Sequence, residues 1–265
     1  MNKIAEMWQW AELVCHEPKE LDPKYGVLNF TPMNNKDDYG FIAEFSDKIL
    51  FAFRGTKGKL EPWIQNFDPY PLKDDGKVAY IKDTLKGGLW GDGMIHDGFY
   101  TAWSFFKDPV TQYLKAMNEK KDIYCTGHSR GGALSTLCSR HIAKNLGMPC
   151  SCISYGAPSQ GIAAYRDQYN LLPIYHTRVV NGYDIVPNLP PYDLGFRHVG
   201  ILMNLSQPAW HKWFHRIRDH FYTSYTKAIK KYSLGKGDKE AVALMDQVLR
   251  SCEREAHGAR YSERL

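Results

Sequence analysis

The residue of this sequence best placed to do chemistry is a serine flanked by two glycines. Residues 127–131 read Gly-His-Ser-Arg-Gly, with Ser129 at the centre. Glycines on both sides let a strand and a helix approach closely, so the serine can occupy a sharp strand-to-helix turn with its hydroxyl exposed. The pattern predicts a nucleophilic serine. A glycine-rich helix start with an N-capping serine is the alternative interpretation.

The residues around this turn are typical of a strand followed by a helix. Residues 123–125 are strand-like, and apolar residues recur behind the turn at helical spacing, namely Leu134, Leu137, Cys138 and Ile142. The helix would begin directly after the serine. We therefore expect the backbone amide of Arg130 to face the atom that Ser129 attacks and to stabilise negative charge there.

A serine hydroxyl becomes an effective nucleophile when a histidine accepts its proton and an acid orients that histidine. With this kind of turn the chain order is serine, acid, histidine. Asp184 follows a predicted strand over residues 175–180 and precedes a proline-rich loop, so it is the candidate acid; a solvated loop aspartate is the alternative. Thr56, Ser129 and Asp184 each follow a predicted strand, so we expect them to meet at one edge of the sheet.

Strand-like and helix-like segments alternate along the chain. We expect an opening helix over residues 4–15, a hairpin over 39–53, a helix from His96, strands over 151–155, 175–180 and 196–203, and a final helix after Gly237. This alternation predicts parallel βαβ units and a mostly parallel, doubly wound α/β sheet flanked by helices. We expect a single domain over residues 1–265, with a core over about 39–225 and a helical extension over about 226–265.

Residues 57–95 form a long segment without regular spacing, although it carries apolar side chains such as Trp63 and Trp90. Loops of this length in compact domains are usually functional or mobile. The segment could cover a hydrophobic cleft as a flap, or its apolar side chains could pack onto the core. Both interpretations stay open.

The composition is that of a globular protein with a mildly basic surface. Of the 265 residues 43% are hydrophobic, and the net charge is +5. The charges are scattered, which argues against nucleic acid as a partner. Neither a signal peptide nor an apolar run of 18 residues is visible, and we expect the six cysteines to be free thiols. A cytoplasmic protein is therefore expected.

Four short motifs occur along the chain at residues 53–56, 96–99, 127–132 and 181–191. They read Phe-Arg-Gly-Thr, His-Asp-Gly-Phe, Gly-His-Ser-Arg-Gly-Gly and Asn-Gly-Tyr-Asp-Ile-Val-Pro-Asn-Leu-Pro-Pro. Together they resemble the class 3 lipases, the fungal-type branch of the α/β-hydrolases, and the resemblance covers residues 39–225.

The resemblance implies roles for individual residues. Ser129 would be the nucleophile, Asp184 the orienting acid, and the backbone amides of Thr56 and Arg130 the oxyanion hole. The Thr56 hydroxyl would assist. Arg54 and His96 would hold the loop architecture, and His128 would pack behind the turn.

The histidine has two candidates. Residues 219–225 resemble the family segment that delivers the catalytic histidine, which implies His220. His198 lies in a segment that resembles a structural strand, and it is the second candidate. A metal site made of His211, His215 and His220 is not favoured, because no carboxylate or cysteine completes a ligand set with helical geometry.

These expectations together describe a serine carboxylic-ester hydrolase with an α/β-hydrolase fold. It would cleave acyl esters of lipids, triacylglycerol or related, through a Ser-Asp-His triad and an acyl-enzyme, without cofactor or metal. Its partners would be a lipid or ester substrate and, transiently, a membrane or lipid-droplet surface. A phospholipase, an acyltransferase, or an inactive hydrolase-fold binding protein are the alternatives.

Overall fold

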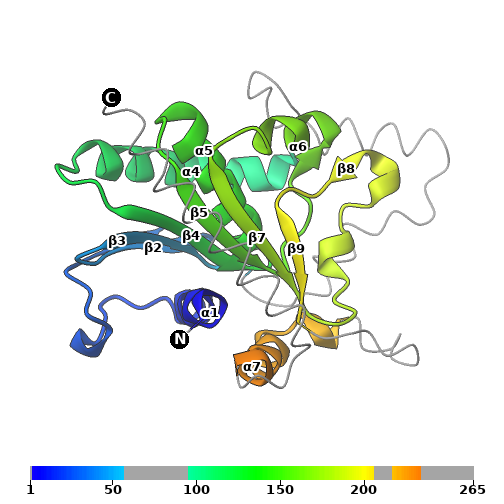
Figure 1. Ribbon diagram of the computed structural model, residues 1–265, viewed down its shortest axis with the longest axis horizontal. Helices are drawn as coiled ribbons and strands as arrows, with labels where there is room; N and C mark the ends of the chain where they lie inside the picture. The colour runs from blue at the N-terminus through cyan, green and yellow to red at the C-terminus, as the bar shows by residue number, and fades with distance from the viewer. Residues whose placement is uncertain (1, 57–94, 206–216, 234–265) are drawn as a thin grey trace, which may run out of the picture.

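A seven-stranded sheet forms the centre of the structure, a computed structural model that describes residues 2–56, 95–205 and 217–233 (Figure 1). The strands lie in the order β1-β2-β3-β4-β5-β7-β9. Their bounds are Asn29–Asn34, Tyr39–Glu44, Lys48–Phe53, Asp122–His128, Cys150–Tyr155, Ile174–Val180 and Ile201–Asn204. The first three strands pair antiparallel, and the pairs from β3 to β9 are parallel.

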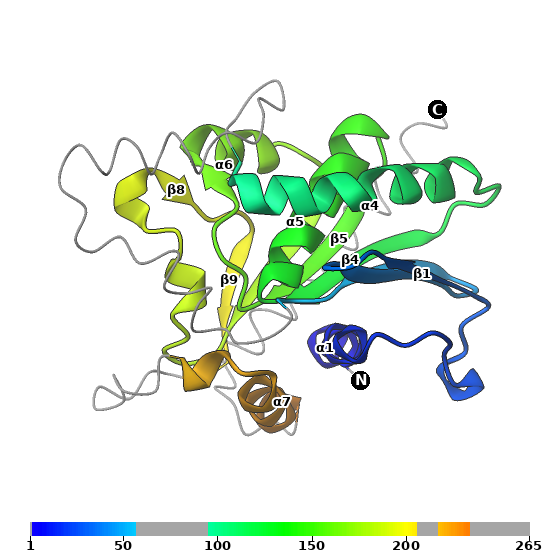
Figure 2. The same cartoon turned by 180° about the vertical axis from the view of Figure 1, so that it is seen from behind.

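Helices cover both faces of this sheet. Helices α4, α5 and α6 lie on one face, whereas α1 and α7 lie on the other (Figures 1 and 2). The bounds are Lys3–Leu13 for α1, Asp97–Lys115 for α4, Arg130–Asn145 for α5, Ala163–Tyr169 for α6 and Tyr222–Lys231 for α7. One apolar cluster lies on each side of the sheet, which is why β3 and β4 are buried along almost their whole length.

This architecture confirms the predicted mostly parallel sheet flanked by helices, and the hairpin of β2 and β3 is also confirmed. Strand β1 and helix α6 were not expected from the sequence. Helix α7 spans residue 225, the position at which the expected core over residues 39–225 was to end and the expected helical extension to begin.

The single strand expected over residues 196–203 is wrong. The segment forms β8, Phe196–Arg197, which pairs with β6, Gly161–Ile162, and then β9, which joins the large sheet. Gly200 separates them with a φ of 75°, and a Cβ there would lie 2.6 Å from Cγ of His176. An uninterrupted strand is therefore excluded here for two reasons. The positive φ of Gly200 is not a strand conformation, and a side chain at this position would collide with His176.

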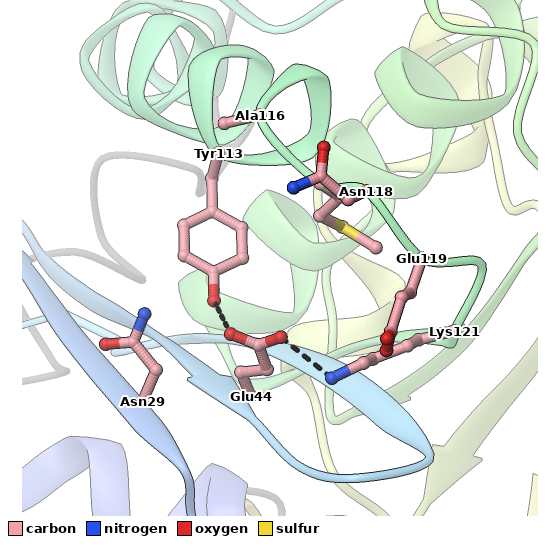
Figure 3. Close-up of a pocket in the computed structure, with 8 residues that line it drawn as sticks. Asn29, Glu44, Tyr113, Ala116, Asn118, Glu119 and Lys121 are labelled. Atoms are coloured by element: carbon pink, nitrogen blue, oxygen red, sulfur yellow. Dashed lines mark hydrogen bonds and ion pairs between the residues drawn. The ribbon is translucent and has the colours of Figure 1, made fainter.

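A polar contact joins α4 to β2 at the amino-terminal edge of the parallel strands (Figure 3). Tyr113 donates a hydrogen bond of 2.7 Å to Oε2 of Glu44, and Lys121 Nζ donates one of 2.8 Å to Oε1. Both contacts lower the pKa of Glu44. They lie beside a pocket of about 360 Å³. The carboxyl ends of the strands, where catalytic groups were expected, are at the opposite edge.

Buried neutral histidines predict a stability that depends on pH. His176 bonds to Ser154 and Tyr169, and burial together with the charge of Arg178 lowers its pKa to about 3; the same causes lower the pKa of His198 to about 4. Below pH 6.5 the unfolded chain binds protons that the folded chain does not. The stabilisation from each histidine is complete above pH 6.5 and is lost as the pH falls to its folded pKa, about 3 for His176 and about 4 for His198.

We therefore expect the free energy of unfolding to be lower at pH 4.5 than at pH 7, by on the order of 1–3 kcal/mol for each histidine. Urea unfolding at a series of pH values measures this difference. The variant His176→Gln should show a shallower pH dependence than the wild type, which separates the histidine from the carboxylates. Equal slopes in the two proteins would contradict the assignment.

Several expectations lie outside the described residues. They concern the flap over residues 57–95, of which only Ile95 is described, His211 and His215, and the helix after Gly237. Within the described ranges, none of the helices has the length and apolar character that a membrane crossing requires.

Candidate active site

Ser129 occupies a sharp turn between β4 and α5. Its φ and ψ are 60° and −128°, a conformation that L residues adopt only when the surrounding structure imposes it. The Ser129 amide donates a hydrogen bond of 2.9 Å to the carbonyl of Tyr155 on the neighbouring strand β5. The turn is therefore held by the sheet on one side and by the helix on the other.

Two glycines permit this turn because the chain segments around them are in direct contact. A Cβ at Gly131 would lie 2.1 Å from the carbonyl oxygen of Phe53, and one at Gly127 would lie 2.4 Å from the carbonyl oxygen of Gly131. No side chain fits at either position. The glycine spacing thus brings the start of α5 directly against the end of β3.

Ser129, His220 and Asp184 form a continuous hydrogen-bonded chain. The distance from Ser129 Oγ to His220 Nε2 is 2.8 Å, and His220 Nδ1 lies 2.8 Å from Oδ2 and 2.9 Å from Oδ1 of Asp184. All three residues are at most 4% exposed. His198, the second candidate, instead contacts the carbonyl of Pro187 through Nε2. The geometry is that of a nucleophile, a base and an orienting acid.

The carboxylate of Asp184 has further donors that fix its orientation. The amide of Val186 donates to Oδ1 at 2.9 Å, and the hydroxyl of Tyr225 donates to Oδ2 at 2.7 Å. Tyr225 in turn accepts from the amide of Asn181 at 3.2 Å. Burial and the charge of Asp184 raise the pKa of Tyr225, so it stays a protonated donor. Tyr225 is the last residue of the segment 219–225 that implied His220, but its contact with Asp184 was not expected from the sequence.

Aromatic rings pack behind the histidine. The ring of His128 stacks on that of His220 with centroids 4.6 Å apart, and Trp8 contacts His128 edge-on and stacks on Tyr225. Burial, with the charge of His220, lowers the pKa of His128, so this ring is a neutral packing partner. Trp8 Nε1 donates to Oγ1 of Thr226 at 3.0 Å. Helix α1 therefore contributes to the wall of the site.

Thr56 and Arg130, the residues expected to form an oxyanion hole, both lie close to the turn at Ser129. A Cβ at Gly55 would lie 3.0 Å from the carbonyl of His128 and 3.4 Å from Cβ of Ser129, so the chain just before Thr56 packs against the turn. Oγ1 of Thr56 is buried and has no hydrogen-bond partner among the described residues. Arg130 is the first residue of α5, where amides have no acceptor within the helix. Both positions thus offer donors near Ser129.

Arg54 and His96 make structural contacts. Arg54 is buried and bonds to the carboxylate of Glu17 and the carbonyl of Asp37. His96 caps helix α4 by accepting a hydrogen bond of 3.1 Å from the amide of Gly98. Among the residues that the structure describes, no group of three histidine, cysteine, aspartate or glutamate side chains could hold a metal ion.

Gly156 offers a test of this geometry. Its φ is 53°, and a Cβ there would lie 2.7 Å from Oδ2 of Asp184 and 3.2 Å from Cε1 of His220. We expect Gly156→Ala to displace both side chains and to lower kcat by at least about tenfold, because small displacements of reacting groups cost large factors in rate. Stability should also fall, by about 1–3 kcal/mol. Ester hydrolysis and urea unfolding measure the two effects.

Gly147 is the matched control. Its φ is 67°, but a Cβ there would meet nothing within 4 Å. Gly147→Ala should therefore lose stability through backbone strain alone and keep its kcat. If Gly156→Ala retained the kcat of Gly147→Ala, the crowding around Asp184 would not affect catalysis.

Comparison with known proteins gives a consistent result. A secreted mono- and diacylglycerol lipase of Fusarium solani is 32% identical over 154 residues, which cover 57% of this chain and 42% of that protein. A phospholipase A1 of Oryza sativa subsp. indica is 31% identical over 178 residues, covering 57% and 40%. The chain thus matches less than half the length of either relative.

Solved structures show the same fold. The lipase of Rhizopus microsporus var. chinensis superposes with a TM-score of 0.56 at 23% identity, covering 78% of this chain and 76% of that one. A triacylglycerol lipase of Penicillium expansum superposes with a TM-score of 0.58 at 20% identity, covering 76% and 79%. The profile of the family lipase (class 3) matches residues 50–194. Because that match spans more than half of the chain, the protein belongs to the class 3 lipase family.

Proposed function

We propose that this chain is a serine carboxylic-ester hydrolase that cleaves acyl esters of lipids. The observation that carries the proposal is the hydrogen-bonded chain from Ser129 through His220 to Asp184. Membership of the class 3 lipase family and relatives named as lipases support it. No cofactor is part of the proposal, since the three side chains supply nucleophile, base and acid.

The proposed reaction begins when Ser129 Oγ attacks the acyl carbonyl carbon and His220 Nε2 accepts the hydroxyl proton. Asp184 stabilises the resulting imidazolium. The amides of Thr56 and Arg130 donate to the tetrahedral oxyanion, and loss of one such donor typically costs about 3–4 kcal/mol of transition-state stabilisation. His220 then protonates the departing alcohol. Water attacks the acyl-enzyme with the same base, and the carboxylic acid leaves.

Two substrate classes follow from the relatives. Relatives named as mono- and diacylglycerol lipases support neutral acylglycerols, the class that we favour, and relatives named as phospholipase A1 support phospholipids as the second. Titration of the acid released from triacylglycerol, diacylglycerol and phosphatidylcholine emulsions would rank them. A series of p-nitrophenyl esters of increasing chain length would give the acyl preference.

Labelling with a fluorophosphonate, followed by peptide mapping, tests the proposal directly. The reagent phosphonylates an activated serine, so we expect one labelled peptide, carrying Ser129. An acyl ester present during the reaction should slow the labelling. A wild type that neither labels nor cleaves any ester of the series would overturn the proposal in favour of a hydrolase-fold binding protein.

The remaining expectations belong to the same proposal. We infer a single α/β-hydrolase domain over residues 1–265, and a substrate that is reached at a membrane or lipid-droplet surface. Flotation with phosphatidylcholine vesicles would test that contact. The expected cytoplasmic location stays a prediction, which fractionation of the source cells would check.

A further inference from the structure

The turn between β1 and β2 lies beside the proposed oxyanion hole. Pairing of Gly40 with Phe53 places the beginning of β2 next to the end of β3, and Thr56 follows three residues later. The side chain of Asn35 closes this turn by accepting from the amides of Asp37 and Asp38 at 2.8 and 2.7 Å. The turn is therefore closed by its own side-chain hydrogen bonds.

Asp38 forms an ion pair with the first residue of α5. Its Oδ1 lies 2.7 Å from Nη2 of Arg130, and the two side chains are only 11% and 19% exposed. Oδ1 of Asp38 has no aligned hydrogen-bond donor among the described residues, so the Arg130 guanidinium is the group that compensates its burial. Shielded pairs of this kind are screened far less by water and salt than surface pairs.

The same turn also holds the other side of the oxyanion hole. Arg54 donates to the carbonyl of Asp37, and its own amide donates to the carbonyl of Tyr39 at 2.9 Å. Arg54 stands two residues before Thr56. The turn thus contacts both segments that would supply oxyanion donors, one through Asp37 and one through Asp38.

We propose that Asp38 is a positioning residue whose ion pair with Arg130 holds the Arg130 amide in the orientation that the oxyanion requires. The proposal rests on the function proposed above. Arg130 directly follows Ser129, whose strained backbone needs restraint from its surroundings. The side chain of Arg130 ties that strained turn to the β1–β2 turn.

The expected consequence concerns the transition state more than substrate binding. A displaced amide donates poorly to the oxyanion, which forms only during the reaction, whereas the acyl chain binds elsewhere. Asp38→Asn should therefore lower kcat by about 10- to 100-fold and leave KM within about twofold. The rate of fluorophosphonate labelling should fall with kcat, because phosphonylation needs the same donors.

A double-mutant cycle tests whether Asp38 acts through Arg130. Arg130→Met removes the guanidinium and keeps the amide, so Asp38→Asn should cause little further loss of kcat in that background. Arg130→Lys, which keeps a cation, should lose less than Arg130→Met. Asp167→Asn is the matched control, since Asp167 pairs with Arg166 at the same 2.7 Å but is 62% exposed; it should keep wild-type kcat and KM.

The outcomes separate this inference from the proposed function. If the wild type is labelled and Asp38→Asn is labelled at the same rate, the inference is overturned and the hydrolase proposal stays intact. Additive losses of kcat in the cycle would also overturn it, because Asp38 would then act without Arg130. Should Asp38→Asn unfold, the comparison of Arg130→Lys with Arg130→Met decides the matter: equal kcat values would refute the role of the ion pair.

Discussion

Ser129→Ala is expected to lower kcat for ester hydrolysis by about 10⁴-fold or more and to abolish fluorophosphonate labelling. The reason is that in the proposed mechanism the Ser129 hydroxyl oxygen, which lies 2.8 Å from His220 Nε2, forms the bond to the acyl carbon. Without it, binding and the oxyanion donors still give a small residual rate over water. Burst kinetics with a p-nitrophenyl ester would show the loss of the acyl-enzyme.

Ser135→Ala is the control for this substitution. Ser135 is fully buried on α5, the helix that begins directly after Ser129, and its hydroxyl donates to the carbonyl of Gly132 at 2.8 Å. The change removes the same atom from a similar environment, so a general effect of serine removal on folding would appear in both variants. Retention of labelling in Ser129→Ala, at another serine, would show that the nucleophile has been assigned to the wrong residue.

The parts of the site that the sequence could indicate are those with a local pattern. The turn at Ser129 has glycines at fixed spacing because the structure tolerates no Cβ at Gly127 or Gly131. Asp184 lies four residues after the end of β7, at the edge where parallel strands present their functional residues. In these places a short stretch of sequence carries the signal, even where the obstacle itself comes from another strand, as Phe53 does at Gly131.

The parts that the sequence did not indicate depend on contacts between distant segments. Tyr225 reaches Asp184 from 41 residues away, and Trp8 reaches Thr226 from 218 residues away. Asp38 faces Arg130 because β2 runs antiparallel to β3, which places the start of β2 beside the end of β3. Trp8 and Asp38 have no type or spacing that differs from ordinary core or turn positions, and for Tyr225 the segment over residues 219–225 did not indicate the contact with Asp184, so only the fold identifies these roles.

The break at Gly200 is a further case of this kind. Residues 196–203 were expected to form one strand, but the close contact with His176 and the positive φ of Gly200 turn the chain between β8 and β9. That turn also decides the environment of His198. Its ring contacts the carbonyl of Pro187, on the loop that follows Asp184.

His220→Ala is the second substitution with a large expected effect, and His198→Gln is its counterpart. His220 lies within hydrogen-bond distance of both Ser129 and Asp184, so its removal should lower kcat by about 10⁴-fold or more. His198 has a pKa lowered to about 4 by burial and by the charge of Arg178, which makes it a weak base at neutral pH. We expect His198→Gln to keep kcat within about threefold.

The two variants must be compared under conditions in which the same fraction of each is folded, because each substitution removes a buried ring. Circular dichroism melting gives that check, and added imidazole gives a readout that a purely structural role would not move. Imidazole can enter the space left in His220→Ala and accept the proton of Ser129, so it should restore part of the activity there and change nothing in His198→Gln. A silent His198→Gln beside an active His220→Ala would instead make His198 the base, and the contact between His220 and Ser129 would then be structural only.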